Sequence, residues 1–323
     1  MQIEHVGLFN FRSIKVLSFS PSEKINIIYG ANNAGKTSLI EAIYLSSCSK
    51  SFKNIDLDYL VNYDTKSFKI STKCSYNTLN DIIILEKTLN SPKKLLINEK
   101  KASVKDSMIK LPVIVLNFGN QNIFTQKPEA RRSLLDWGVF HVKHDYHNLL
   151  KQFNKILVSR NKTLKTRDMS QIDIWTEKFI ETAILVNECR ESYFNSLNKY
   201  YVELMTNTDD LRPILYEDII QTKLTYSKGW EGSLTEAMRL SKDKDLACGY
   251  TTCGPHRADF VATTSNGNIS DLASMSSQVV LNFCIVLAQS RAFHVEHQHN
   301  PILMIDDLFF GIDDKNLGVV IKL

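Results

Sequence analysis

The sequence has no CxxC pair, and its six cysteines are scattered along 323 residues. This distribution favours a reduced protein rather than one held together by disulfides. No apolar run reaches the length of a membrane span, about 18–20 residues. The N-terminal segment also lacks the basic start and long apolar core of a signal peptide. These absences predict a cytoplasmic protein.

The chain also lacks a strong excess of charge of either sign. Its net charge is +4 and its pI about 8.6, values that permit a basic patch without requiring one. Hydrophobic residues make up 43% and charged residues 23%, which are ordinary values for a globular protein. The length corresponds to about two domains of roughly 150 residues each, so the chain is long enough to bury a sizeable core.

The order of predicted elements divides the chain into a β-rich start, a helical middle and a β-rich end. From Glu129 to about Asn207 apolar residues recur every three or four positions, which predicts several helices. A short helix is expected at Ser233–Ser241, a long apolar helix at 276–293, and a buried strand in PILMIDD at 301–307. The strands expected before residue 120 are QIEHVGLF, KVLSF, KINIIY, SFKISTKC, DIIILEKTL, KLLIN and PVIVLN.

The segment GANNAGKT, Gly30–Thr37, fits the pattern GxxxxGK[ST]. Its glycines let the backbone curl so that successive N–H groups point at phosphate oxygens, and the following helix N-terminus adds a partial positive charge. Lys36 is predicted to reach the β- and γ-phosphates, and Thr37 to offer its hydroxyl to Mg²⁺. INIIY supplies the strand that should precede this loop, and SLIEAIYL supplies the helix that should follow it. The predicted phosphate-binding residues are Gly30, Ala31, Asn32, Asn33, Ala34, Gly35, Lys36, Thr37 and Ser38.

A phosphate loop of this kind needs an acidic residue to hold the magnesium, usually at the end of a buried strand. PILMIDD supplies two acids, and we expect Asp306 to bind Mg²⁺ and Asp307 to polarise the attacking water. The catalytic residues are therefore predicted to be Lys36 and Asp307. Lys36 and Asp306 are 270 positions apart, much farther than in small GTPases and nucleotide kinases. Such spacing is typical of ABC and SMC ATPases, in which a large insertion separates two halves of one site.

Several further motifs occur in a fixed order along nearly the whole chain. They are FRSI, GANNAGKTSLIEAIY, SKSFKN, KPEARRSLLDWGVFH, LLKQFNKILVSRN, CGPHRADF and IDDLFFGIDD. Taken together, these motifs mean that the chain resembles the RecF family, the bacterial recombination-repair members of the ABC/SMC-like ATPases.

The resemblance implies an α/β fold, an ABC/SMC-like P-loop ATPase head lobe with an inserted, largely helical second lobe. Residues 1–125 and 250–323 would form the two halves of the ATP-binding lobe, and residues 126–249 the second lobe. It also implies that ATP closes a homodimer, with Ser274 in LASMSSQ as the signature serine that reaches the γ-phosphate of the partner subunit. Asp313 would lie in the loop after the acid pair and face the partner subunit.

The resemblance further implies binding to duplex DNA next to single-strand gaps. With RecR and RecO, such a protein promotes RecA loading. It is expected to be a weak, DNA-dependent ATPase that hydrolyses ATP slowly. The cofactors implied are ATP and Mg²⁺.

The chain departs from the family pattern in three places. Ser276 and Ser277 stand where the signature segment has glycine and glutamine, with Gln278 one residue farther on. Gly119 stands at the family's acidic position near the metal, where Asn117, Asn120 or Gln121 is a neutral substitute. The chain also ends at residue 323, before the helix, strand and switch residue with which the family normally continues. These departures favour an alternative, a diverged or truncated nucleotide-responsive DNA-binding module with little or no ATPase activity.

Basic residues provide candidate DNA contacts, because lysine and arginine bind phosphates in a salt-sensitive way that does not depend on sequence. Solvated surface charge is an equally good interpretation of each cluster. His256 and Arg257 are open to two interpretations, a nucleotide or lobe-interface contact, or a structural turn in which Arg257 pairs with Asp259. Arg131 and Arg132 are open in the same way between DNA or interface contacts and helix-surface charge. The basic clusters are Lys50 and Lys53; Lys93, Lys94, Lys100 and Lys101; and Arg160, Lys162, Lys165 and Arg167.

Overall fold

The computed structural model describes residues 1–77, 79–117, 122–207, 211, 215, 217–307, 317–318 and 321. Two compact units divide the chain. The first contains Met1–Asn117 together with the segment that begins at His297, and the second contains the intervening segment up to Glu296. These boundaries differ from 125 and 250, the limits expected for the ATP-binding lobe. Because compactness does not test nucleotide binding, the assignment of 1–125 and 250–323 to that lobe stays a prediction.

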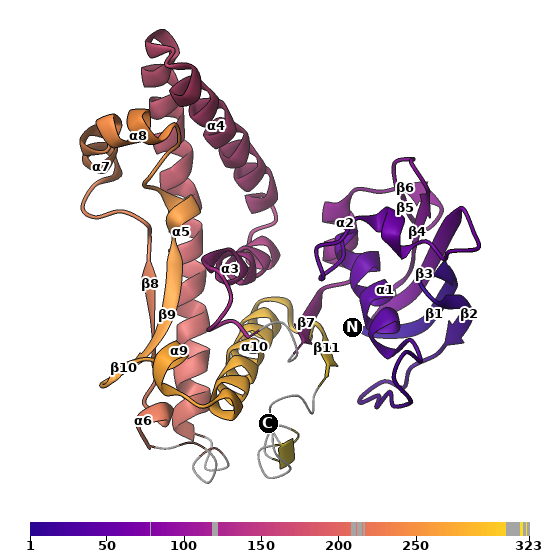
Figure 1. Cartoon of the computed structure of the whole chain (residues 1–323). Coiled ribbons are helices and arrows are strands. Elements are labelled where there is room, and N and C mark those ends of the chain that lie inside the picture. The colour runs from indigo at the N-terminus through magenta and orange to yellow at the C-terminus, as the bar shows by residue number, and fades with distance from the viewer. Residues whose placement is uncertain are drawn as a thin grey trace. The chain divides into compact units, whose positions relative to one another are not determined.

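Alternating apolar and polar residues in the first unit build an antiparallel sheet of six strands in the order β2-β1-β3-β4-β5-β6 (Figure 1). In β3 the inward side chains of Phe68, Ile70, Thr72 and Cys74 are buried while alternate residues face out, as the twofold period of a strand requires. The strands are β1 (Gln2–Phe11), β2 (Ile14–Phe19), β3 (Ser67–Tyr76), β4 (Leu79–Thr88), β5 (Lys94–Ile97) and β6 (Lys100–Lys101).

Two helices and a second, parallel pair of strands complete this unit. Helix α1 (Lys36–Cys48) contacts β1, β3 and β4, and it also contacts β7 (Val113–Asn117) and β11 (Ile302–Asp306). Strands β7 and β11 pair in register from Val113 opposite Ile302 to Asn117 opposite Asp306. The remaining elements are the 3-10 helix η1 (Leu57–Leu60) and α2 (Val104–Lys110). The strands predicted at PVIVLN and PILMIDD are therefore confirmed, and they are neighbours.

The strand predicted immediately before the glycine loop is wrong. Residues 24–29 form no strand, and Ile25, Ile27 and Tyr29 are 79%, 82% and 89% exposed. An apolar run gains its strand preference from cross-strand pairing and burial rather than from the backbone alone. In this structure the run has no paired neighbour among the described residues, so its composition does not decide its conformation.

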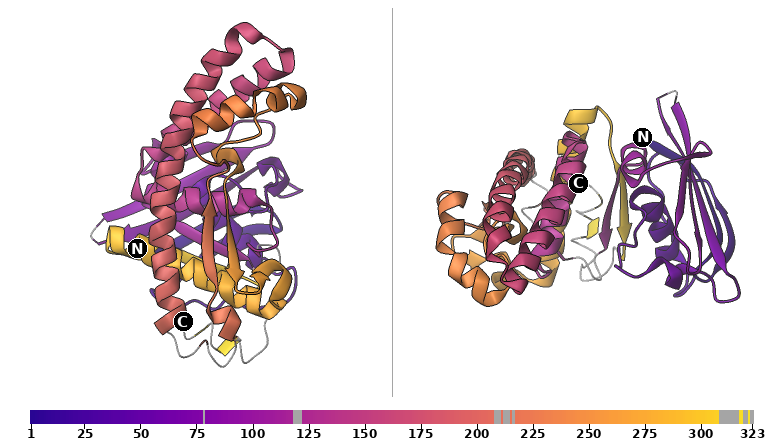
Figure 2. Two further views of the ribbon diagram at one scale, coloured as in Figure 1. Left: turned by 90° about the vertical axis from the view of Figure 1, so that its left-hand side faces the viewer. Right: turned by 90° about the horizontal axis from the view of Figure 1, so that it is seen from above.

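Helices dominate the second unit, as predicted from apolar residues that recur every three or four positions. The long helices α4 and α5 lie side by side, α3 packs against α5, and the three-stranded sheet β10-β9-β8 contacts α5 through β8 (Figures 1 and 2). The helices up to residue 220 are α3 (Pro128–Val142), α4 (Tyr146–Thr166), α5 (Met169–Asn207) and α6 (Glu217–Ile220). The later elements are β8 (Lys223–Ser227), α7 (Leu234–Leu240), α8 (Lys242–Cys248), η3 (Pro255–Arg257), β9 (Asp259–Thr264), β10 (Gly267–Asn268), α9 (Ile269–Leu272) and α10 (Met275–His297).

Close packing explains the single glycine in the helical stretch. A Cβ atom at Gly138 in α3 would lie 1.8 Å from Cζ of Tyr193, whose ring is buried in α5. Only a residue without a side chain fits there, so Gly138 marks a close approach of α3 to α5 and not a break between helices.

Helix α10 is the predicted long apolar helix. Among the described residues it is the one helix long and apolar enough to cross a membrane by length and composition, and 72% of that apolar window is buried inside the structure. Its Gln289 donates a hydrogen bond to the carbonyl of Leu134, and Phe293 packs on the ring of Trp137, both in α3. Most of its apolar surface is therefore covered by the protein itself.

Candidate functional site

The glycine loop turns sharply into α1. Gly35 has φ 94°, in the left-handed region, and a Cβ atom there would lie 3.2 Å from Ile14 Cδ1. Asn33 also has a positive φ of 64°. Nζ of the partly exposed Lys36 donates to the carbonyls of Gly30 and Ala31 at 2.8 and 2.9 Å. The predicted residues Gly30–Ser38 therefore lie in one loop and the first turn of α1, and the lysine folds back over that loop.

Thr37 and Asp306, which are 269 positions apart in sequence, are brought together. Thr37 Oγ1 donates to Oδ1 of Asp306 at 3.2 Å, and Asn117 Nδ2 donates to the other carboxylate oxygen at 2.9 Å. Asp306 and Asn117 are paired residues at the carboxyl ends of the parallel strands β11 and β7. The pairing of these strands therefore carries the expected acid to the first turn of the glycine-loop helix.

The carboxyl group of Asp306 is held in an environment that favours a bound cation. Burial raises its pKa above the ordinary value, and the neighbouring charge of Asp307 raises it further, against the hydrogen bond from Thr37. Asp307 itself leaves the strand with a positive φ of 55°. Two adjacent acids, one of them buried, together with a threonine hydroxyl, are hard oxygen donors of the kind that Mg²⁺ prefers. The residues present therefore fit the expected metal.

Glu41 is a residue of this region that the sequence analysis missed. Its side chain is fully buried in α1, accepts a hydrogen bond from Ser51 and forms an ion pair with Arg12 at 2.5 Å. Arg12 follows β1 in the FRSI motif, and Ser51 lies in SKSFKN. A carboxylate among the apolar residues of SLIEAIYL was the available signal. Glu41 therefore ties two of the family-like motifs to the glycine-loop helix.

Ser274, the expected signature residue, caps α10. Its Oγ accepts a hydrogen bond from the backbone N–H of Ser277 at 3.2 Å and contacts the Ser277 hydroxyl at 3.0 Å. The amide of Gln278 is buried, donating to the carbonyl of Ala273 at 3.0 Å and accepting from Asn122 Nδ2 at 2.7 Å. Gln278 is thus engaged inside the second unit and not presented at the helix end.

The structure does not contain the pairing of Arg257 with Asp259, which was one of the two interpretations left open by the sequence. Arg131 makes a two-pronged ion pair with Asp259, at 2.6 Å from Nε and 2.9 Å from Nη2, and its remaining nitrogen donates to the carbonyls of Ile123 and Gln126. Arg257 is exposed, with its guanidinium over the Tyr250 ring. The spacing in RAD suggested a local pair, whereas folding brings α3 beside β9 and gives Asp259 a closer partner. Arg132 similarly donates to the Ala258 carbonyl, so both arginines of α3 have structural contacts.

His256 in the same turn is partly buried and packs against two aromatic rings. It lies against Phe153 and Phe179, and its Nε2 is 3.0 Å from the carbonyl oxygen of Thr251. Burial lowers the pKa of its imidazole to about 4, with help from the nearby charges of Arg257 and Arg132. The ring is therefore neutral at physiological pH. Asp313, Gly119, Asn120 and Gln121 lie outside the described residues.

Comparison with known proteins places these features in a family. The model of the AAA domain matches residues 5–200. The DNA replication and repair protein RecF of Pseudoalteromonas translucida (strain TAC 125) is 31% identical over 95% of this chain and 84% of its own length. The protein of the same name from Francisella tularensis subsp. tularensis (strain WY96-3418) is 30% identical over 97% of this chain and 88% of its own length.

Solved structures agree on the fold. A structure described as the recombination mediator protein RecF-ATPrS in the RecFOR pathway has a TM-score of 0.85 and 23% identity, covering 98% of this chain and 89% of that one. The Smc head domain of Pyrococcus furiosus, with an extended coiled coil and bound to part of ScpA, gives a TM-score of 0.54 at 14% identity, covering 99% and 85%. The expected fold class, an ABC/SMC-like α/β ATPase head with an inserted helical part, is confirmed.

We expect Glu41→Gln to destabilise the first unit, because the substitution leaves the partly buried Arg12 without its counter-charge. Losing one partner of a fully buried ion pair costs about 3–5 kcal/mol, and partial exposure of Arg12 reduces that figure. Urea denaturation should show a lower midpoint. Glu86→Gln is the matched control, since Glu86 is a partly exposed acid paired with Lys69 and Lys94. Equal midpoints for the two variants would contradict this role of Glu41.

We expect His256 to make the protein less stable in mild acid. Its folded-state pKa lies below the unfolded value, so its contribution is complete above pH about 6.5 and is lost as pH falls towards about 4. The loss corresponds to about 3 kcal/mol. Urea denaturation between pH 4 and 7 measures it, and His256→Gln, which cannot gain a proton, should show a smaller dependence on pH. The same slope in both proteins would refute this assignment.

Proposed function

Since this chain belongs to the RecF family of DNA replication and repair proteins, we propose that it binds ATP with Mg²⁺ and acts at DNA as an ATP-dependent dimer. One observation carries the proposal, the hydrogen bond of Thr37 to Asp306 beside a complete GxxxxGK[ST] loop. A P-loop alone is compatible with many enzymes, whereas this contact across most of the chain supports the assignment of both segments to one nucleotide site.

We assign the phosphates of ATP to the loop Gly30–Ser38, in which backbone N–H groups and Lys36 provide positive charge. Thr37 and Asp306 would hold Mg²⁺, which neutralises phosphate charge when bound. Asp307, directly after the strand, would orient and polarise the attacking water. Glu41 is a positioning residue in this proposal, because it fixes α1 against the segments that contain Arg12 and Ser51.

In the proposed dimer, the start of α10 would contact the ATP that is bound by the partner subunit. The N-terminus of a long helix carries a partial positive charge that favours anions. Ser274, the capping residue there, would reach the γ-phosphate bound by the partner subunit. ATP would then be shared by two subunits, and its hydrolysis would release them.

We further propose that the dimer binds duplex DNA next to single-strand gaps and works in the cytoplasm with RecR and RecO to promote RecA loading. Support comes from the structurally similar protein described as a recombination mediator in the RecFOR pathway. The fold is shared over nearly the whole of both chains.

A second candidate is a nucleotide-responsive DNA-binding module with little or no hydrolysis. The specific observation that favours it is the engagement of Gln278. Its amide bonds with Ala273 and Asn122, so it does not take the place of the family's signature glutamine. Ser276 and Ser277 also remain in place of the family's glycine and glutamine.

Replacing Lys36 tests nucleotide binding. We expect Lys36→Ala to abolish ATP binding measured by calorimetry and to abolish the ATP-dependent gain in affinity for gapped DNA in a gel-shift assay. The fold should be retained, because the partly exposed Lys36 bonds only to its own loop. Lys24→Ala, which changes an exposed lysine of the first unit, is the control. DNA binding that is indifferent both to ATP and to Lys36→Ala would overturn the proposal.

Replacing Asp307 separates the two candidates. If the protein hydrolyses ATP, Asp307→Asn should abolish turnover with gapped DNA while leaving ATP affinity nearly unchanged, because the amide keeps the shape but not the charge. Phosphate release at saturating DNA is the measurement. Turnover in the wild type that is absent from the variant rejects the inactive module. No turnover above background in the wild type supports that module.

A further inference from the structure

Helix α4 carries positive charge without any negative charge. Its sequence from Tyr146 to Thr166, YHNLLKQFNKILVSRNKTLKT, contains four lysines and one arginine but no aspartate or glutamate. The neighbouring helix α5 has the opposite balance, with six acids and three basic residues over Met169–Asn207. Since α4 and α5 lie side by side (Figure 1), the helix pair is electrically asymmetric.

The four lysines of α4 share one exposed face. Lys151, Lys155, Lys162 and Lys165 are all exposed, and at about 100° per residue they lie within an arc of about 80° around the helix axis. Val158, 68% exposed, lies in the middle of the same face. From the first lysine to the last the axis rises about 21 Å. We call these four residues the lysine stripe.

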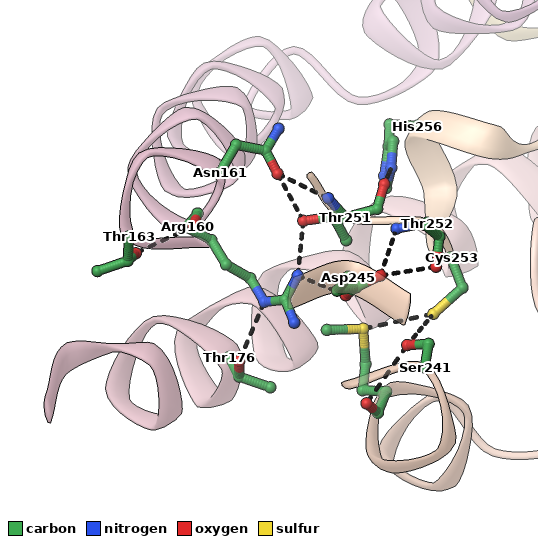
Figure 3. A network of polar contacts seen from close by, with 11 residues as sticks. Arg160, Asn161, Thr163, Thr176, Ser241, Asp245, Thr251, Thr252, Cys253 and His256 are labelled. Atoms are coloured by element: carbon green, nitrogen blue, oxygen red, sulfur yellow. Dashed lines mark hydrogen bonds and ion pairs between the residues drawn. The ribbon is translucent and has the colours of Figure 1, made fainter. Parts of the chain in front are cut away.

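Arg160, which the sequence analysis grouped with Lys162 and Lys165, does not belong to the stripe. Its side chain is buried, and Nη1 donates to Asp245 at 2.8 Å and to the hydroxyl of Thr251 at 2.7 Å, while Nε donates to Thr176 at 3.0 Å (Figure 3). Asp245 also accepts hydrogen bonds from Thr252. Arg160 therefore anchors the inner side of α4 to α5, α8 and the following loop, and it fixes which side faces out.

We propose that the lysine stripe contacts the phosphate backbone of duplex DNA, an assignment that rests on the DNA-binding function proposed above. The four ammonium groups form no ion pair with any acid among the described residues. A row of lysines about 21 Å long would span about six base pairs of duplex at 3.4 Å each. Each lysine acts as a point charge that suits a phosphate.

The composition of the stripe favours nucleic acid over an acidic protein. Protein interfaces are depleted in lysine and centred on aromatic or other large apolar side chains. Val158 is the one apolar residue of this face, and both aromatic residues of α4, Tyr146 and Phe153, are 1% exposed on the other side. The same absence favours duplex over single-stranded DNA, because single-strand sites use exposed aromatic rings on which bases stack.

The test is a quadruple variant in which Lys151, Lys155, Lys162 and Lys165 are replaced by glutamine. Glutamine has nearly the helix propensity of lysine, so the fold should be kept, which circular dichroism and unchanged ATP affinity would verify. Affinity of the full chain with ATP for a duplex of defined length should fall on the order of 10- to 100-fold. The plot of log affinity against log salt has a negative slope. In the variant this slope should become less steep by about 0.9 for each phosphate that is no longer neutralised.

The control carries the same change of charge elsewhere. Lys24, Lys66, Lys127 and Lys223 are exposed lysines outside the three basic clusters named from the sequence, and glutamine at these four positions should leave the affinity and the salt slope close to those of the wild type. Equal losses in both quadruple variants would overturn the assignment, because they would reflect net charge alone. A stripe variant with wild-type affinity and slope would also overturn it.

Further arms identify the partner and separate this assignment from the proposed function. Wild-type protein that binds polyglutamate as tightly as a duplex of equal charge would overturn the assignment in favour of an acidic-protein site. A loss in the stripe variant confined to single-stranded DNA would overturn the duplex preference. Wild-type protein that binds no DNA at all would refute the proposed function itself, whereas a stripe variant that keeps the affinity and salt slope of the wild type would refute the stripe alone.

Discussion

The parallel pairing of β7 with β11 is the interaction on which the candidate site depends. Asn117 ends one strand and Asp306 ends the other, and the register between them leaves no freedom in where the acid lies. Because both strands run in the same direction, the acid reaches the end of the pair at which Thr37 lies. Most of the second unit lies between these two strands in the sequence. The position of the acid therefore depends on the strand pairing and not on the length of the inserted segment.

Buried ion pairs orient elements in both units. Glu41 joins α1 to Arg12, and Arg160 joins α4 to Asp245. Such pairs contribute little net stability, because desolvation offsets their attraction, but breaking one partner is costly. Their main effect here is to fix the orientation of the helices that contain them. One fixes the helix that begins at the glycine loop, and the other decides which side of α4 is packed and which carries exposed lysines.

A single helix thus combines a packing surface and a charged surface with different sequence requirements. The inner side of α4 needs Phe153, Ile156 and Leu164 at helical spacing, together with a partner for Arg160. The outer side needs only lysines and the absence of acids, which constrains composition but not shape. The absence of acids from α4 gives its exposed side one sign of charge that a polyanion can recognise.

The sequence by itself determined which residues form the candidate nucleotide site, and it determined most of the helices and strands. GxxxxGK[ST], the acids of PILMIDD and the helical period of residues 129–207 are local patterns whose physical meaning needs no long-range contact. Tertiary structure alone decided the partners of Arg131, Arg160 and Glu41, the exposed conformation of Ile25–Tyr29 and the packing of Gly138 on Tyr193. The partner of a buried charge or of a strand depends on which distant segments come together in the fold. Arginines, acids and apolar runs occur throughout the chain, so the local sequence does not identify the partner.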